Sequence, residues 1–280
     1  MVKNRNATGA GSGVSLLRRL PAGRKADLAA YVYEQGQVTV AELAEQFEVS
    51  LDTIRRDLDE LDADKILIRT HGGAIMPDLI PRPDTGIDVR LRVQVARKEA
   101  IGIAAATLVE NNSVIIMNAG TTILAVARHL ANHTGLTVVS NNLQISTELQ
   151  PKSFRALHII GGTVLHSSQA TIGPVSFQTS GGGGELNIQC NLALLAVGGV
   201  SVDGGYSLNN FAETSMMKEM MARSEKVAIL ADSTKYGSRL FAQLGDLGRA
   251  DYFVTDVVPP KDLLDALKEN KVEIVIPPNA

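Results

Sequence analysis

The sequence has few of the residues that mark secreted or membrane proteins. Cys190 is its single cysteine, so no disulfide can form within the chain, and disulfides are typical of oxidising compartments. No apolar run approaches the roughly 20 residues that span a bilayer. The apolar segment 14–17 is too short for the core of a signal peptide and is followed by two arginines. We therefore expect a cytoplasmic protein with no membrane partner, in which Cys190 is a small buried apolar residue.

A large excess of charge is also missing. The formal net charge is -3, so binding to nucleic acid would rely on a few placed contacts more than on bulk attraction. Basic residues gather in front of the first acidic residue, Asp27. They are Lys3, Arg5, Arg18, Arg19, Arg24 and Lys25. We expect residues 1–22 to be a flexible basic leader, either a solubilising tail or an arm that contacts DNA phosphates.

The length and the pattern along the chain favour two domains. With 280 residues, of which 45% are hydrophobic, the chain can bury a core in a short domain and in a longer one. Pro77, Pro81 and Pro83 interrupt the pattern and predict an extended linker. The expected divisions are the leader (1–22), a first domain (23–76), the linker (77–90) and a second domain (91–280).

The second domain alternates short β-branched runs with helical segments. This alternation predicts an α/β fold, Rossmann-like, with a mostly parallel sheet covered by helices on both faces. Its ligand site is expected beyond the carboxyl ends of the strands. The expected strands are Ser113 to Met117, Leu136 to Ser140, Ala156 to Ile160, Ala193 to Val197, Val227 to Ala231, Tyr252 to Thr255 and Val272 to Ile276.

The alternation fails between Thr163 and Asn191. We expect an antiparallel excursion there, with a flexible loop at Gly181 to Gly184. These four glycines are not a phosphate-binding loop, because the Gly-Lys-Ser/Thr ending that supplies a lysine and a metal-binding hydroxyl is missing.

The first domain has the pattern of a helix-turn-helix. Two helices with apolar stripes, the second starting near Val40, precede a third helix for which Ser50 is a suitable N-cap. At about 100° per residue the third helix has two different sides. Its apolar side carries Ile54, Leu58 and Leu61, and its polar side carries Asp52, Arg55, Arg56 and Asp59. Such a helix can bury one side and present two arginines to a major groove, where a guanidinium bonds a guanine or a phosphate.

The segment from Ile66 to Ala74 predicts a β-hairpin whose tip would be a wing. The strings Val49-Ser50, Thr53-Ile54-Arg55-Arg56-Asp57-Leu58 and Arg69-Thr70-His71-Gly72-Gly73-Ala74 resemble the N-terminal signature of the DeoR family of bacterial regulators. The resemblance implies a winged helix-turn-helix that binds a double-stranded DNA operator. The expected DNA-binding residues are Ser50, Asp52, Thr53, Arg55, Arg56, Arg69 and His71.

Polar residues follow several of the predicted strands. Gly120 and two threonines open a helix, whose N-terminus presents free amides that suit a phosphate group. Three further loops end at the same edge of the sheet, and Lys235 adds a full positive charge. The expected effector-binding residues are Asn118, Gly120, Thr121, Thr122, Ser140, Asn141, Gly161, Gly162, Glu213, Asp232 and Lys235. For the paired glycines, ordinary turn chemistry at strand ends is an alternative explanation.

The resemblance to the DeoR family continues through the second domain. It follows the order Arg90, Lys98, Ala119 to Thr122, Ser140-Asn141, Gly161-Gly162, Gly173-Pro174, Glu213, Lys218 and Asp232 to Gly237. It implies a sensor domain similar to ribose-5-phosphate isomerase that binds a phosphorylated sugar. Asn118 stands where the family commonly has aspartate, so no particular sugar carries over.

Metal and cofactor chemistry find little support. His129 and His133 have a spacing that can hold zinc, but no further ligand completes a site. We expect them in the last turn of a helix, where positive charge is favourable. We expect no metal and no cofactor.

Together these patterns predict a transcriptional repressor of sugar-metabolism genes whose operator affinity changes with a phosphorylated sugar. We expect a homo-dimer or homo-tetramer whose paired recognition helices enter major grooves about 34 Å apart. We expect no enzymatic activity. Two alternatives stay open. One is a sugar-phosphate isomerase with a DNA-binding appendage, in which Glu213 or Asp232 is the base; the other is a module whose α/β half serves only for assembly.

Overall fold

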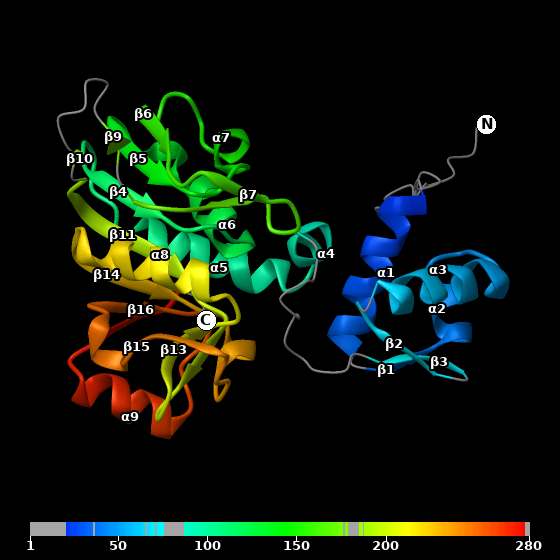
Figure 1. Cartoon of the computed structure of the whole chain (residues 1–280). Coiled ribbons are helices and arrows are strands. Elements are labelled where there is room, and N and C mark those ends of the chain that lie inside the picture. The colour runs from blue at the N-terminus through cyan, green and yellow to red at the C-terminus, as the bar shows by residue number, and fades with distance from the viewer. Residues whose placement is uncertain are drawn as a thin grey trace, which may run out of the picture.

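The computed structural model describes residues 21–35, 37–64, 66–70, 72–75, 87–175, 177–178, 185–186 and 188–277. The first elements form a small N-terminal domain, coloured blue to cyan in Figure 1. They are α1 (Pro21–Gln35), β1 (Gln37–Thr39), α2 (Val40–Gln46), α3 (Leu51–Ala63), β2 (Ile68–Thr70) and β3 (Gly73–Ile75). The three strands pair antiparallel in the order β1-β3-β2. This is the predicted winged helix-turn-helix.

Local caps and one glycine fix the geometry of this domain. The hydroxyl of Thr39 accepts from the amide of Glu42, and the Glu42 carboxylate accepts from the Thr39 amide, so α2 begins with a capping box. Ser50 caps α3 by accepting from the amide of Thr53 at 3.2 Å. At Gly73 a Cβ atom would lie 1.9 Å from the carbonyl oxygen of Val38, so the wing can approach β1 only with glycine at this position.

Seven parallel strands form the sheet of the larger domain, in the order β17-β16-β14-β11-β4-β5-β6. Each predicted strand is present, with small shifts at its ends. They are β4 (Val114–Met117), β5 (Leu136–Ser140), β6 (Phe154–Ile159), β11 (Cys190–Ala196), β14 (Ser224–Leu230), β16 (Tyr252–Val254) and β17 (Glu273–Val275). The order reverses direction between β4 and β11, so a ligand site is expected at this point of the sheet.

Helices cover both faces of the sheet (Figure 1). On one face lie α5 (Val95–Ala106) and α6 (Thr121–His129), and on the other lie α8 (Phe211–Ala222) and α9 (Lys261–Glu269). Alternate residues of β11 belong to the two cores: Leu192 and Leu194 to the first, Ala193 and Leu195 to the second. Cys190 is buried in the second core, as predicted.

Antiparallel pieces interrupt the parallel alternation. As predicted for the stretch from Thr163 to Asn191, β7 (Thr163–Leu165) pairs antiparallel with β8 (Ala170–Ile172), and β9 (Phe177–Gln178) with β10 (Glu185–Leu186). Residues 181–184, predicted to form a loop, lie outside the described residues. A further antiparallel sheet, which the sequence did not predict, consists of β12 (Gly199–Ser201), β13 (Gly205–Leu208) and β15 (Ala242–Gly245).

Two short helices complete the fold, α4 (Ile87–Arg92) and α7 (Ile145–Glu148), together with 3-10 turns at 130–132, 233–235 and 247–249. Helix α4 begins within the predicted linker 77–90, because Ile87 and Val89 are apolar and find buried positions. It packs against α1 on one side and α6 on the other, and so lies between the two domains (Figure 1). Among the described residues, no helix combines the length and the apolar character needed to cross a membrane.

Candidate functional site

Helix α3 has the two sides that its sequence predicts. Ile54, Leu58 and Leu61 are buried in the core of the N-terminal domain. The opposite side is exposed and carries Asp52, Arg55, Arg56 and Asp59. Arg55 forms an ion pair with Asp52, one turn before it, at 3.0 Å. This pair is exposed, so its guanidinium can exchange the carboxylate for a DNA phosphate or base edge at little cost.

The other expected DNA-binding residues lie around this helix. Ser50 and Thr53 bond each other through their hydroxyls at 2.8 Å, at the start of α3. Arg69, on the wing strand β2, bonds the carboxylate of Asp59 through its guanidinium, and its amide donates to Asp62 at 3.1 Å. The wing is therefore attached to α3. His71 lies outside the described residues.

Two ion pairs join α1 to α3, and they change the interpretation of the basic leader. Arg24 donates to both carboxylate oxygens of Asp57, at 2.6 and 3.1 Å. Lys25 donates to Glu60 at 2.5 Å. Arg24 and Lys25 are thus structural partners of α3 and not part of an arm toward DNA. Residues 1–20, with the remaining basic residues, lie outside the described residues.

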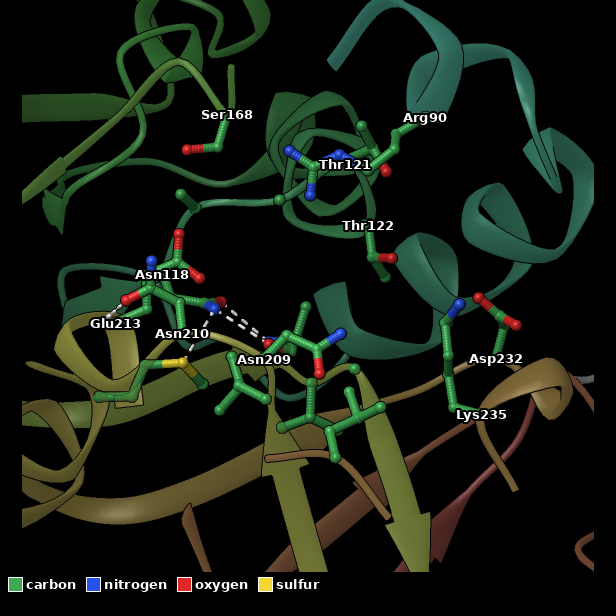
Figure 2. A pocket seen from close by; sticks show the side chains of 18 of the residues that line it. Arg90, Asn118, Thr121, Thr122, Ser168, Asn209, Asn210, Glu213, Asp232 and Lys235 are labelled. Atoms are coloured by element: carbon green, nitrogen blue, oxygen red, sulfur yellow. Dashed lines mark hydrogen bonds between the residues drawn. The ribbon is translucent and has the colours of Figure 1, made fainter. Parts of the chain in front are cut away.

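A cavity of about 380 Å³ lies at the carboxyl ends of the central strands, where the strand order reverses. Residues after β4, β5, β11 and β14 reach it, and so do α4, α5 and α8 (Figure 2). Of the expected effector-binding residues, eight line it: Asn118, Gly120, Thr121, Thr122, Asn141, Glu213, Asp232 and Lys235. The prediction that several strand ends converge on one site thus agrees with the geometry.

Three expected residues do not line this cavity. Ser140 is fully buried, and its hydroxyl accepts from the amide of Asn142 at 3.1 Å. Gly161 and Gly162 are exposed and form the turn before β7, where the amide of Gly162 donates to Ile172. Gly161 has a φ of +95°, which explains the glycine by turn conformation.

Asn118 holds two strands together at the base of the cavity. Its Nδ2 donates to the carbonyl of Ala196 at 2.9 Å, and its Oδ1 accepts from the amide of the same residue at 2.8 Å. Both bonds are drawn in Figure 2. A carboxylate can accept but not donate, so only an amide makes both bonds. The asparagine is therefore explained by the junction of β4 with β11.

The N-terminus of α6 faces the cavity without a side-chain cap. Gly120, its N-cap residue, has a φ of +150° and makes no side-chain cap bond. The next two residues, Thr121 and Thr122, line the cavity. The first amides of a helix have no partner within the helix and carry partial positive charge. They are suited to bind an anion.

Three cations and two carboxylates line the cavity: Arg90, Lys98, Lys235, Glu213 and Asp232. Burial lowers the pKa of Lys98 to about 8, and the positive charges of Lys235 and Arg90 contribute, against the opposing effect of Asp232. Burial also lowers the pKa of Lys235 and of Arg90. The pKa of Glu213 is raised by burial, an effect that Arg90 opposes. An anionic ligand would stabilise the charged form of all three cations.

Several buried polar atoms at the cavity have no hydrogen-bond partner within the described part of the chain. They are the hydroxyl of Tyr33, Nε of Arg90, Oδ1 of Asn141 and the hydroxyl of Ser168. Native proteins leave few such groups unpaired. This set contains donors and acceptors, which suits a ligand with both phosphate and hydroxyl oxygens.

Sequence reasoning missed part of the lining. Tyr33, Ser168, Asn209 and Asn210 gave no signal, because they come from α1 and from loops after antiparallel strands. Arg90 and Lys98 belong to the residues that resemble the family, but the sequence pattern does not show that they line the site. Lys98 donates to the carbonyls of Arg90 and Val93, at 2.5 and 2.6 Å.

The two histidines have protein partners. His129 is the last residue of α6, and its Nε2 lies 2.7 Å from Oε2 of Glu99. His133 follows a 3-10 turn, with Nε2 3.1 Å from the carbonyl oxygen of Val109. In the described ranges, no three His, Cys, Asp or Glu side chains are grouped to hold a metal ion.

Comparison with known proteins gives the following matches. The family model of the DeoR C terminal sensor domain matches residues 93–257, and that of the DeoR-like helix-turn-helix domain matches residues 24–79. The HTH-type transcriptional repressor CsqR of Escherichia coli (strain K12) is 29% identical, over 88% of this chain and 92% of its own. The Glycerol-3-phosphate regulon repressor of the same strain is 29% identical, over 87% of this chain and 94% of its own.

A third relative, the uncharacterized HTH-type transcriptional regulator YulB of Bacillus subtilis (strain 168), is 30% identical over 92% of this chain and 98% of its own. Among solved structures, ribose 5-phosphate isomerase from Plasmodium falciparum is similar with a TM-score of 0.36 and 11% identity, over 50% of this chain and 52% of that one.

Proposed function

Because the chain belongs to the DeoR family, we propose that it is a DNA-binding transcriptional repressor whose cavity binds a phosphorylated sugar. Ligand binding changes its affinity for the operator. Relatives over most of the chain are named as repressors, one of them of a glycerol-3-phosphate regulon. The observation that carries the ligand proposal is the cavity itself, with three desolvated cations beside an uncapped helix N-terminus.

For DNA, we propose that α3 is the recognition helix. Arg55 and Arg56 stand on its exposed side and contact base edges or phosphates, while Ser50 and Thr53 at its N-terminus and Arg69 on the wing contact the backbone. Two chains place their α3 helices in major grooves about 34 Å apart on a palindromic site. The assembly is a homo-dimer or homo-tetramer.

For the ligand, we propose that Arg90, Lys98, Lys235 and the amides of α6 hold the phosphate. Ser168 and Asn209 (Figure 2), together with Asn141, bond sugar hydroxyls. One charged hydrogen bond contributes about 1.5 to 3 kcal/mol, so Lys235→Met weakens binding about 10- to 100-fold.

A gel-shift titration tests both parts. The DNA is a fragment obtained by selection from random sequence, and the added compounds are glycerol 3-phosphate, glucose 6-phosphate and fructose 6-phosphate. We expect one of these compounds to change the operator affinity by about 5- to 150-fold, the usual range of allosteric coupling. Lys235→Met is expected to remove this change while leaving DNA binding without ligand intact. The proposal fails if no phosphorylated sugar alters the affinity.

We propose no catalytic activity for the cavity, although an isomerase would also bind a sugar phosphate. Such chemistry needs a free carboxylate base beside the substrate carbons. Asp232 already accepts from the amide of Thr234, at 3.0 Å, and from its hydroxyl. Glu213 is the other carboxylate that lines the cavity in the described residues. Incubation with ribose 5-phosphate is expected to give no ketose product; conversion that Glu213→Gln abolishes would restore the isomerase alternative.

A further inference from the structure

Tyr33 belongs to the DNA-binding domain, yet it lines the cavity of the sensor domain. It lies near the end of α1, is 3% exposed, and belongs to the core of the N-terminal domain. Burial raises the pKa of its hydroxyl to about 12, and the nearby carboxylate of Asp232 raises it too, while a hydrogen-bonding interaction with Thr234 and the charge of Arg97 act in the opposite direction. The phenol of one domain thus lies beside the 232–235 turn of the other.

The hydroxyl of Tyr33 is completely buried and forms no hydrogen bond of good geometry with the described residues, although the hydroxyl of Thr234 interacts with it. The hydroxyl of Thr234, its neighbour, is already committed to Asp232. A buried hydroxyl without a well-formed hydrogen bond destabilises the fold, and a phenylalanine would fill the same space without this penalty. The hydroxyl is therefore explained by a partner that enters the cavity.

Helix α4 forms a wall that the two domains share. Val89 and Val93 belong to the core of the N-terminal domain, whereas Arg90, between them in sequence, lines the cavity. Arg92 bonds Asp27 on α1 through an ion pair. A ligand that contacts Arg90 would therefore contact the same short helix against which α1 packs.

We propose that Tyr33 is a ligand-binding residue that the DNA-binding domain contributes to the sensor cavity, where its hydroxyl donates to an oxygen of the phosphorylated ligand. This rests on the proposed function and adds a means of regulation to it. A ligand held by Tyr33 and Arg90 together favours the arrangement in which α1 is docked on α4. Because Arg24 and Asp57 tie α1 to α3, the position of the recognition helix follows, and ligand and operator affinities become coupled.

The test compares Tyr33→Phe with Tyr31→Phe in the full chain. Tyr31 lies on the same helix, is half-buried, and packs edge-to-face on Phe47 with ring centroids 6.0 Å apart. Isothermal titration uses glycerol 3-phosphate, glucose 6-phosphate, fructose 6-phosphate and inorganic phosphate. We expect Tyr33→Phe to bind the best of these compounds about tenfold more weakly, the loss of one hydrogen bond. Tyr31→Phe is expected to match the wild type.

Two further measurements separate a ligand contact from a structural role. Without ligand, Tyr33→Phe is expected to melt at the same or a higher temperature than the wild type, because it loses only an unpaired hydroxyl. The sequence has no tryptophan, so tyrosine emission is visible, and its change on adding ligand should be lost in Tyr33→Phe alone.

The outcomes distinguish this inference from the function on which it rests. If Tyr33→Phe binds as tightly as the wild type while Lys235→Met is weakened, the inference is wrong and the sugar-phosphate site stands. If Tyr33→Phe melts at a lower temperature and binds as before, the hydroxyl is structural, and the inference is wrong as well. If none of the compounds binds the wild type, the proposed function fails and this inference fails with it.

Discussion

The two ion pairs between α1 and α3 allow a comparison within one domain. Arg24–Asp57 and Lys25–Glu60 join the same helices at similar distances, 2.6 and 2.5 Å. Their exposure differs: the side chains of the first pair are 18% and 6% exposed, and those of the second are 29% and 50% exposed. The perturbation is to remove each partner by alanine, singly and together, in both pairs.

The structure gives different expectations for the two pairs. Asp57→Ala leaves the Arg24 guanidinium without its partner, and Arg24→Ala leaves a nearly buried carboxylate. Removing one member of a fully buried ion pair lowers the free energy of unfolding by about 3 to 5 kcal/mol. Because Arg24 can still reach water, we expect each single change to lower the free energy of unfolding by about 2 to 3 kcal/mol. The expected coupling energy between the two residues is about 2 kcal/mol. For Lys25 and Glu60 we expect a coupling close to zero, since solvent and salt screen it.

The assay is urea unfolding followed by far-ultraviolet circular dichroism, analysed as two double-mutant cycles. Two transitions are fitted where two are seen, because the chain has two domains, each with its own hydrophobic core. Raising the salt concentration should weaken the Lys25–Glu60 pair more than the Arg24–Asp57 pair. If the coupling of Arg24 with Asp57 is no larger than that of Lys25 with Glu60, burial does not determine the strength of these pairs and our reasoning is wrong.

Three more predictions concern the two sites. Arg55→Ala and Arg56→Ala should each abolish operator binding in a gel shift without lowering the melting temperature; binding as tight as that of the wild type would mean that the recognition helix is misplaced. Affinity for a phosphorylated sugar, measured by calorimetry, should fall as pH rises through about 8, because Lys98 loses its proton there. The fall should be absent in Lys98→Met. A wild-type affinity that does not change with pH would contradict this role of Lys98. Gly120→Ala should lower the free energy of unfolding by about 1 to 3 kcal/mol, because a φ of +150° strains the backbone of any residue other than glycine. An unchanged urea unfolding curve would show that alanine is not strained at this position.

Much of the fold could be predicted because the relevant interactions are local. Buried parallel strands are continuous apolar runs, so the seven strands of the large sheet were found within a few residues of their ends. The two sides of α3 follow from helical periodicity and from the cap at Ser50. Strand ends in a parallel sheet meet at one edge, so the sequence predicts that Asn118, Thr121 and Lys235 lie in one site, and all three line the cavity.

The tertiary structure decided which segments far apart in the chain contact each other. Nothing in the local pattern shows that Arg24 pairs with Asp57, or that Gly161 serves a turn and not the ligand. Likewise, Tyr33 has the spacing of a core residue, and its hydroxyl meets the other domain only because α1 packs on α4. The sequence by itself determined the elements and the edge of the sheet at which the cavity lies. Packing between domains decided which side chains reach that edge, because periodicity tells which face of a helix is buried but not against what.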